Sequence, residues 1–314
     1  MEYTRELFTS IENRNKEFNA ILNGAEYNKG LQINNIKRIL CNFAIGEFVE
    51  AVRLKLAGRR ISTKNADKAD NMAWKLPDTF DSYRQFHNKK IVVYTCIIGK
   101  YDQLKEPLLA FDNVTYICFT DDQANIDATA DTKWEIRSVP ENILKTYEGT
   151  LTNRYVKMHP HELFPEADYS IYVDGNVKIV SFPGAYLPDT MGKAGLAIYA
   201  HGQRNCVYDE AQICIMRKKG KKAFIERQMQ RYSAEGFPAN YGLYECTIIA
   251  TDLKNNNSRQ IFESWWHEFM NSQSFRDQLS LPYVIWKNGF EYTDIGLLGT
   301  NIFDDYRITV YSHR

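Results

Sequence analysis

An acid, a glycine and an amide directly follow one apolar run, Ile171-Tyr172-Val173-Asp174-Gly175-Asn176. Ligands bind at the carboxyl ends of strands in open α/β sheets, and Asp174 lies at such an end. Asn176, two residues on, points to the same side of an extended chain, and Gly175 permits close approach of a ligand. A carboxylate and an amide oxygen suit Mg²⁺ or Mn²⁺ held against a diphosphate. The alternative is an Asp that merely closes a turn.

Two cations and a further acid lie in segments that this strand would meet. Arg154 and Lys157 are three residues apart in a helix-forming stretch, so they share one helix face. They suit a diphosphate leaving group, because stabilising developing charge is usually the largest catalytic contribution; a solvated basic face is the alternative. Glu245 lies in the apolar segment 242–249, where a carboxylate is costly to bury unless it is paired. Glu245 is therefore a third functional candidate.

The elements that must position these side chains alternate along the chain. The strand-like segments are residues 89–99, 113–122, 132–139, 168–180, 195–201 and 242–252. The helix-forming segments are residues 148–167, 202–238 with a break at Gly220, 258–273 and 274–289. Such alternation predicts an α/β fold with a mainly parallel sheet flanked by helices.

The N-terminal part of the chain has a different texture. Apolar residues recur at helical spacing from Leu31 to Arg60, and the polar stretch from Ser62 to Tyr83 is typical of a linker. We therefore predict a helical region and linker over residues 1–88 and a catalytic α/β domain over residues 89–314. The N-terminal helices suit packing against that domain, partner docking or contact with a membrane surface.

Composition and missing motifs narrow the function. The 314 residues carry 39 Lys and Arg against 39 Asp and Glu, and this zero balance disfavours a general nucleic-acid binder. We find no apolar run of membrane-spanning length, secretory leader or C-x-x-C pair, which favours a reducing, cytoplasmic location. P-loop, G-x-G-x-x-G, G-x-S-x-G and H-E-x-x-H signatures are also absent.

Asp174-Gly175-Asn176 resembles the D-x-D element of GT-A glycosyltransferases, with Asn in place of the second Asp. Longer blocks are similar to a family of bacterial and plant proteins once described only as a domain of unknown function and now regarded as glycosyltransferase-like. Family-eight-like glycosyltransferases are more distant relatives. The similar blocks span about residues 90–290: VVYTCIIGKYDQL, ICFTDD, NRYVKMHPHELFPEADYSIYVDGNVKI, HGQRNCVYDEAQICI, EGFPANYGLYECTII and SFRDQLSLPYVIWK.

The resemblance implies a GT-A-like Rossmann-type mixed sheet and a metal-dependent glycosyltransferase. The donor would be a nucleotide-sugar, with a UDP-sugar favoured, and the acceptor a saccharide or lipid-linked saccharide. It further implies Mn²⁺ or Mg²⁺ as cofactor and a role in bacterial capsule or lipopolysaccharide synthesis, with peripheral contact to the inner face of the membrane as an additional option. The alternatives are a nucleotidyltransferase, a lipid hydrolase and a non-catalytic nucleotide-sugar-binding protein.

The resemblance also assigns roles to single residues. It gives the metal to Asp174, Asn176 and the nearly terminal His313. Catalytic roles fall to Asp277, Glu245, Arg154 and Lys157. Substrate contacts fall to Tyr101, Asp121, Asp122, His201, Arg204, Arg276 and Gln278.

Several of these residues have simpler interpretations. Tyr101 suits stacking on the nucleotide base or a surface loop, and Asp121 and Asp122 suit contact with base or ribose or the capping of a helix. His201 suits acceptor or metal binding or the capping of the next helix. Asp277 suits sugar hydroxyls, a base, or a helix N-terminus. The basic run 217–222 suits a solvated helix junction, an anionic membrane surface or an anionic acceptor.

Overall fold

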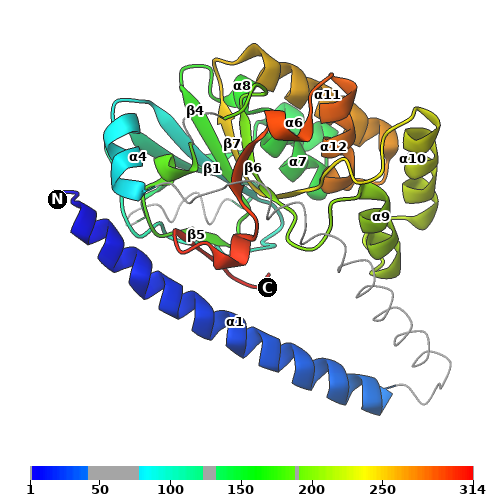
Figure 1. The fold of residues 1–314 in the computed structure, drawn as a ribbon, viewed down its shortest axis with the longest axis horizontal. Coiled ribbons are helices and arrows are strands. Elements are labelled where there is room, and N and C mark those ends of the chain that lie inside the picture. Colours follow the sequence, from blue (N-terminus) through cyan, green and yellow to red (C-terminus); the bar gives the residue numbers. More distant parts are fainter. Residues whose placement is uncertain (1, 42–77, 123–131, 188–190, 314) are drawn as a thin grey trace.

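In the computed structural model, residues 2–41, 78–122, 132–187 and 191–313 are described (Figure 1). Within these ranges the main sheet has seven strands in the order β3-β2-β1-β4-β7-β6-β8. The strands are β1 (Ile91–Ile97), β2 (Val114–Thr120), β3 (Trp134–Ser138), β4 (Tyr169–Val173), β6 (Leu196–Ala200), β7 (Tyr244–Asp252) and β8 (Gly296–Gly299). Strand β7 runs antiparallel to β4 and β6, and the other neighbours are parallel. This mixed, mainly parallel sheet confirms the predicted fold class.

Strand β1 is continuously apolar because both of its faces are covered. Alternate residues enter two separate apolar clusters: Ile91 and Val93 lie in one, and Tyr94 and Cys96 in the other. This period of two is that of a pleated strand. The sheet is thus the middle layer of three.

Helices on the two faces differ. One face carries α7 (Thr150–Met158), α9 (Val207–Met216), α10 (Lys222–Ala234), α11 (Asn256–Ser272) and α12 (Asp277–Lys287). The other carries α1 (Arg5–Cys41), α4 (Thr79–Phe86) and a two-stranded sheet of β5 (Val177–Ile179) and β9 (Ile308–Val310). Figure 1 shows α1 running along one side of the molecule, beside β5 and the C-terminal segment.

Some predicted boundaries change. The expected linker is partly wrong, because Asp78 caps the helix α4 with hydrogen bonds from the backbone N–H groups of Phe80 and Asp81; residues 62–77 lie outside the described residues. The predicted helix 148–167 is interrupted at Pro160, which starts the separate turn α8 (Pro160–Leu163). The helical prediction for 31–60 is confirmed to Cys41, and its remainder lies outside the described residues.

Short elements were not predicted. These are α6 (Glu141–Thr146), β8, β9 and the 3₁₀ turns η2 (Pro183–Tyr186), η3 (Tyr292–Asp294) and η4 (Ile302–Asp304). Strands β8 and β9 have four and three residues, too few to establish a period. Their pairing depends on strands distant in the sequence.

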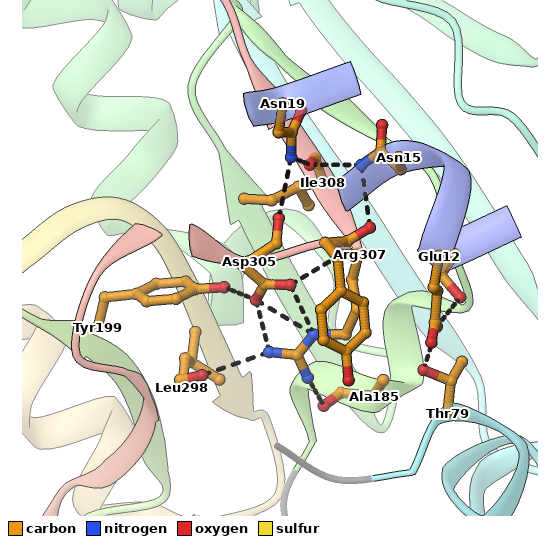
Figure 2. A network of polar contacts seen from close by, with 12 residues as sticks. Glu12, Asn15, Asn19, Thr79, Ala185, Tyr199, Leu298, Asp305, Arg307 and Ile308 are labelled. Atoms are coloured by element: carbon orange, nitrogen blue, oxygen red, sulfur yellow. Dashed lines mark hydrogen bonds and ion pairs between the residues drawn. The ribbon is translucent and has the colours of Figure 1, made fainter. Parts of the chain in front are cut away.

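The N-terminal helix is fastened to the C-terminal segment by polar contacts (Figure 2). The Asn15 side-chain amide donates to the carbonyls of Tyr306 and Ile308, at 2.9 and 2.7 Å. The Asn19 amide also donates to Ile308, at 2.7 Å. Phe8 enters the same apolar cluster as the sheet. The described part of the N-terminal region therefore packs directly on the α/β layers.

Next to this contact lies a fully buried ion pair (Figure 2). The Arg307 guanidinium is 2.6 Å from the Asp305 carboxylate and donates to the carbonyls of Ala185 and Leu298 at 2.9 and 3.3 Å. The Tyr199 hydroxyl donates to Asp305. This network fixes β9, and β9 pairs with β5, which directly follows Asn176.

Candidate active site

A cavity of about 960 Å³ opens at the carboxyl ends of β1 and β4. Strand β1 has β2 on one side and β4 on the other, so the strand order reverses at this point. Such a switch point is where ligands bind in open α/β sheets. The cavity wall includes many of the predicted site residues: Tyr101, Arg154, Lys157, Asp174, Glu245, Arg276, Asp277, Gln278 and His313.

Asp174 sits at the end of β4, anchored on both sides. Its backbone N–H donates to the Thr247 carbonyl at 3.0 Å, and its carboxylate accepts from the Tyr172 hydroxyl at 2.9 Å. Gly175 is required by close packing, because an added Cβ would lie 2.8 Å from Ile97 Cγ1 and 3.1 Å from Asp102 Cβ. The Asp174 carboxylate is thereby presented at the junction of β1 and β4.

A buried cluster of two cations and one carboxylate forms another part of the wall. Lys157 Nζ lies 2.7 Å and Arg154 Nε 3.0 Å from the same oxygen of Asp277. Burial by itself would raise the pKa of Asp277, but the cations Arg154 and Lys157 hold it well below its usual range. Burial likewise opposes the charge on Arg154, and Asp277 more than offsets this and raises the pKa of Arg154. Arg154 and Asp277 therefore stay charged at neutral pH, and Asp277 is a weak base.

Asp277 is fixed by its own helix. It is the first residue of α12, where an acid is favoured by the helix dipole. Its carbonyl accepts from the Trp265 indole at 3.1 Å, and its carboxylate accepts from the backbone N–H of Gln278 at 3.0 Å. The Gln278 side chain donates to the Tyr244 carbonyl at 2.9 Å. The acid-amide pair thus links α12 to β7.

Glu245 is an acid of the cavity that is suited to proton transfer. It is half-buried on β7, and its carboxylate accepts from the Thr247 hydroxyl at 3.0 Å. Burial raises the pKa of Glu245; the Thr247 hydrogen bond lowers it and the Asp174 charge raises it further. The β6–β7 register shifts next to Tyr199, which pairs with Glu245. Such irregularities re-aim side chains beside active sites, and here Glu245 and Thr247 both line the cavity.

The loop after β1 is held by the two acids that end β2. Gly99 and Lys100 have left-handed φ angles of 62° and 57°. Asp121 accepts from the Gly99 backbone N–H at 2.9 Å, and Asp122 lies 3.3 Å from Lys100 Nζ. Neither acid lines the cavity. Both instead hold the loop that carries Tyr101.

Tyr101 and His313 meet at the mouth of the cavity. Tyr101 is 63% exposed, and its ring centroid lies 5.2 Å from that of His313. The His313 Nδ1 is 3.0 Å from the Asp102 carboxylate. Asp102 is a cavity residue that we did not single out from the sequence, although it stands within the block VVYTCIIGKYDQL. Its pairing with His313 spans 211 residues, which no local pattern signals.

The donor atoms near Asp174 fit a cation that shares its ligands with a diphosphate. Asn176 donates from its side-chain amide to the Tyr311 carbonyl at 2.5 Å, and its Oδ1 is buried without a hydrogen-bond partner. Asn176 itself does not line the cavity. In the described part of the chain no three His, Cys, Asp or Glu side chains gather as a metal cage. Magnesium commonly uses one or two carboxylates plus substrate phosphates, and Asp174 with the free Asn176 oxygen suits that arrangement.

The structure does not bring His201 and Arg204 to this cavity. His201 Nδ1 accepts from the backbone N–H groups of Gln203 and Arg204 at 3.2 and 3.0 Å. Arg204 pairs with the buried Glu210 of α9. Burial lowers the pKa of His201 to about 4, so this ring is neutral. The arrangement matches the simpler interpretation, in which His201 caps the turn before α9.

The model of the TOD1/MUCI70 glycosyltransferase-like domain matches residues 64–307. The chain belongs to this family. A similar curated protein is the "Probable hexosyltransferase MUCI70" of Arabidopsis thaliana, 25% identical over 216 residues, which are 62% of this chain. The chain spans 37% of that relative's length.

Two solved glycosyltransferases are also similar at 11% identity. The bifunctional glycosyltransferase WbbM has a TM-score of 0.39 and is matched over 67% of this chain and 39% of its own. The galactosyltransferase LgtC, solved with donor and acceptor sugar analogs, has a TM-score of 0.40 over 70% of this chain and 86% of its own.

Among the described residues, no helix combines the length and the apolar character that a bilayer crossing requires.

Proposed function

We propose that the cavity at the ends of β1 and β4 transfers a sugar from a nucleotide-sugar donor, with a UDP-sugar favoured, to a saccharide or lipid-linked saccharide. The observation that carries the proposal is the meeting of Asp174 with Arg154, Lys157 and Asp277 around one cavity. This reaction needs an acid that can hold a metal cation and paired cationic side chains that can contact the diphosphate. The family resemblance supports a bacterial capsule or lipopolysaccharide as the product.

The donor is held from both sides of the switch point. Asp174, together with the Asn176 oxygen, would hold Mn²⁺ or Mg²⁺ against the diphosphate, and the ion would supply charge neutralisation of the leaving group. Tyr101 stacks on the nucleotide base. Arg154 and Lys157 contact the departing diphosphate, where their charge matters most as the glycosidic bond breaks.

Asp277 and Glu245, two further acids of the cavity, have distinct tasks. Asp277 is a positioning residue for Arg154 and Lys157, and its lowered pKa makes it an acceptor of sugar hydroxyls rather than a base. Glu245 has a raised pKa, so it is the better group to receive the proton of the acceptor hydroxyl. This division separates charge stabilisation from proton transfer.

The test is thermal stability with UDP, GDP, CDP and ADP, each with and without Mn²⁺. A ligand that binds the folded state raises the melting temperature by mass action. We expect a Mn²⁺-dependent shift with one nucleotide, strongest for UDP, that disappears in Asp174→Ala. The control is Glu166→Ala, which removes an exposed acid outside the cavity and should keep the shift. No shift with any nucleotide for folded wild-type protein would refute the donor site.

Turnover is tested separately. The nucleotide identified by the shift is supplied as its sugar conjugates, and release of the free nucleotide is followed. Release that depends on Mn²⁺ and on Lys157 supports glycosyl transfer. Binding without release from any conjugate would favour a non-catalytic binding protein.

A further inference from the structure

The cavity has a second, basic region built by two loops. Residues 217–221 join α9 to α10, and residues 273–276 join α11 to α12. The first loop and Lys222, the first residue of α10, carry five cations around Gly220 and no acid. Lys219 and Lys221 from this loop and Arg276 from the other line the cavity. Lys219 and Lys221 are separate from the Arg154–Lys157–Asp277 cluster, whereas Arg276 directly precedes Asp277 and, after Arg154 and Lys157, is the third cation that lowers the pKa of that carboxyl.

The cations that line this region form no close ion pair with the described residues. Within the described part of the chain, Lys219, Lys221 and Arg276 have no carboxylate at ion-pair distance, whereas the neighbouring Lys222 lies 3.7 Å from Glu226. The Arg276 Nε is buried and has no hydrogen-bond partner. A buried donor without a partner is costly. An anion bound beside Arg276 would satisfy it.

The backbone of both loops is held in an uncommon conformation. Lys218 has a φ of 55°, and Gln273 and Phe275 have φ angles of 56° and 52°. Non-glycine residues in the left-handed region are strained, and such strain clusters at ligand sites. Gly220 allows the loops to touch, because an added Cβ would lie 3.0 Å from the Ser274 carbonyl oxygen. The two loops therefore form one fixed wall.

The surroundings of the cations suit a sugar ring. Phe224 and Phe275 also line this region, and Lys221 Nζ lies 5.5 Å from the Phe224 ring centroid. Aromatic side chains with a few convergent polar groups are typical of small-molecule sites. The helix α10 starts here, with no side-chain cap at Lys221, so its positive end adds to the field.

We propose that Lys219, Lys221 and Arg276 form the acceptor subsite and select an acceptor saccharide with a negative charge, a carboxylate or a phosphate. This inference rests on the proposed function, which places the donor diphosphate at Asp174, Arg154 and Lys157. The three cations of the subsite are not needed by the donor diphosphate and are therefore available to the acceptor saccharide. Because they line a cavity, they favour a saccharide over a flat membrane surface.

The test measures binding by isothermal titration calorimetry with a saturating UDP–Mn²⁺ background. The probes are a hexuronate tetrasaccharide, its methyl-esterified form, maltotetraose and mannose 6-phosphate. We expect the hexuronate or the sugar phosphate to bind at least tenfold more tightly than the neutral probes, and the two charged probes distinguish carboxylate from phosphate. Equal affinity for charged and neutral probes, or binding of neither charged probe, would overturn the proposal.

Variants locate the effect. Lys219→Gln/Lys221→Gln should weaken the charged probe at least tenfold, and Arg276→Gln should weaken it independently. The matched control is Lys89→Gln/Lys90→Gln, which removes two charges from an exposed pair outside this cavity. An equal loss in the control would mean that only overall charge matters, and would refute the subsite.

Two readouts keep the outcomes apart. The UDP–Mn²⁺ thermal shift tests the donor site, so a retained shift with no charged-probe preference removes the acceptor proposal and leaves the proposed function intact. Sedimentation with phosphatidylglycerol vesicles tests the membrane interpretation. If the lysine variant loses vesicle binding while the tetrasaccharide affinity is unchanged, the basic loop is a membrane contact and the acceptor proposal is wrong.

Discussion

Two buried charge clusters in this protein have similar members but differ in how completely their charges and hydrogen-bonding groups are paired. Arg307 and Asp305 form a one-to-one pair, and none of their buried polar atoms lacks a hydrogen-bond partner (Figure 2). In the other cluster two cations, Arg154 and Lys157, share one oxygen of Asp277. The Arg154 Nε is near that oxygen but makes no aligned hydrogen bond.

The difference separates a structural from a functional use of buried charge. In the Arg307–Asp305 cluster, the buried polar atoms of both side chains bond to other groups of the protein. The second keeps an excess of one positive charge against the cavity, which suits an incoming diphosphate. Removing a member should therefore reduce stability in the first cluster and turnover in the second.

The largest stability effect is expected from Arg307→Met. It leaves the Asp305 carboxylate buried without its cation, and breaking such a pair costs about 3–5 kcal/mol. The measurement is urea unfolding followed by circular dichroism. Arg14→Met removes an exposed cation from α1 and should change stability by less than about 0.5 kcal/mol. A similar small change in Arg307→Met would show that the pair is dispensable.

The largest catalytic effect is expected from Lys157→Met. Loss of one preorganised charge at the leaving group should lower turnover by about 10²–10³-fold. Because Arg154 still neutralises Asp277, the free energy of unfolding should fall by less than in Arg307→Met. Turnover and urea unfolding are measured on the same preparations. A variant that unfolds as easily as Arg307→Met but keeps its turnover would reverse the comparison.

Glu245 gives a pH-dependent prediction. Its pKa is raised in the folded protein, so ionising it costs stability as pH rises above the ordinary value of the unfolded chain. Glu245→Gln should thus be more stable than wild type at pH 8 and lose that advantage at pH 4. If Glu245 is the base, the acid limb of the pH profile, in which kcat/KM falls toward low pH, also disappears in the variant. An unchanged limb would assign the proton transfer elsewhere.

The smallest catalytic effect is expected at His201, outside the cavity. Its pKa of about 4 lies below the unfolded value of 6.5, so its contribution to stability is complete above pH 6.5 and is lost as pH falls toward 4. His201→Gln should keep turnover within about twofold at pH 7.5, because His201 does not line the cavity. A tenfold loss would instead support the predicted substrate contact.

Features that depend on residues close together in the sequence could be predicted from it. The apolar runs of β1 and β4 end at cavity residues, and Arg154 and Lys157 share a face through helical spacing alone. Contacts between residues far apart in the sequence could not be predicted. His313 meets Asp102 across 211 residues, and Glu245 faces the cavity where the β6–β7 register shifts. Asp121 and Asp122 were placed correctly at a strand end, but their partners on the loop after β1 depend on packing.

The attachment of α1 to residues near Ile308 determines when this helix can reach its final contacts during synthesis. Asn15 donates to Ile308 across 293 residues, so the helix is synthesised long before the segment that it contacts. Strand β5, directly after Asn176, likewise waits for β9. During N-to-C-terminal synthesis the corner at Asp174 therefore acquires its supporting sheet only after β9 has been made. A nascent chain that stops before β9 lacks the strand that pairs with β5 beside this corner.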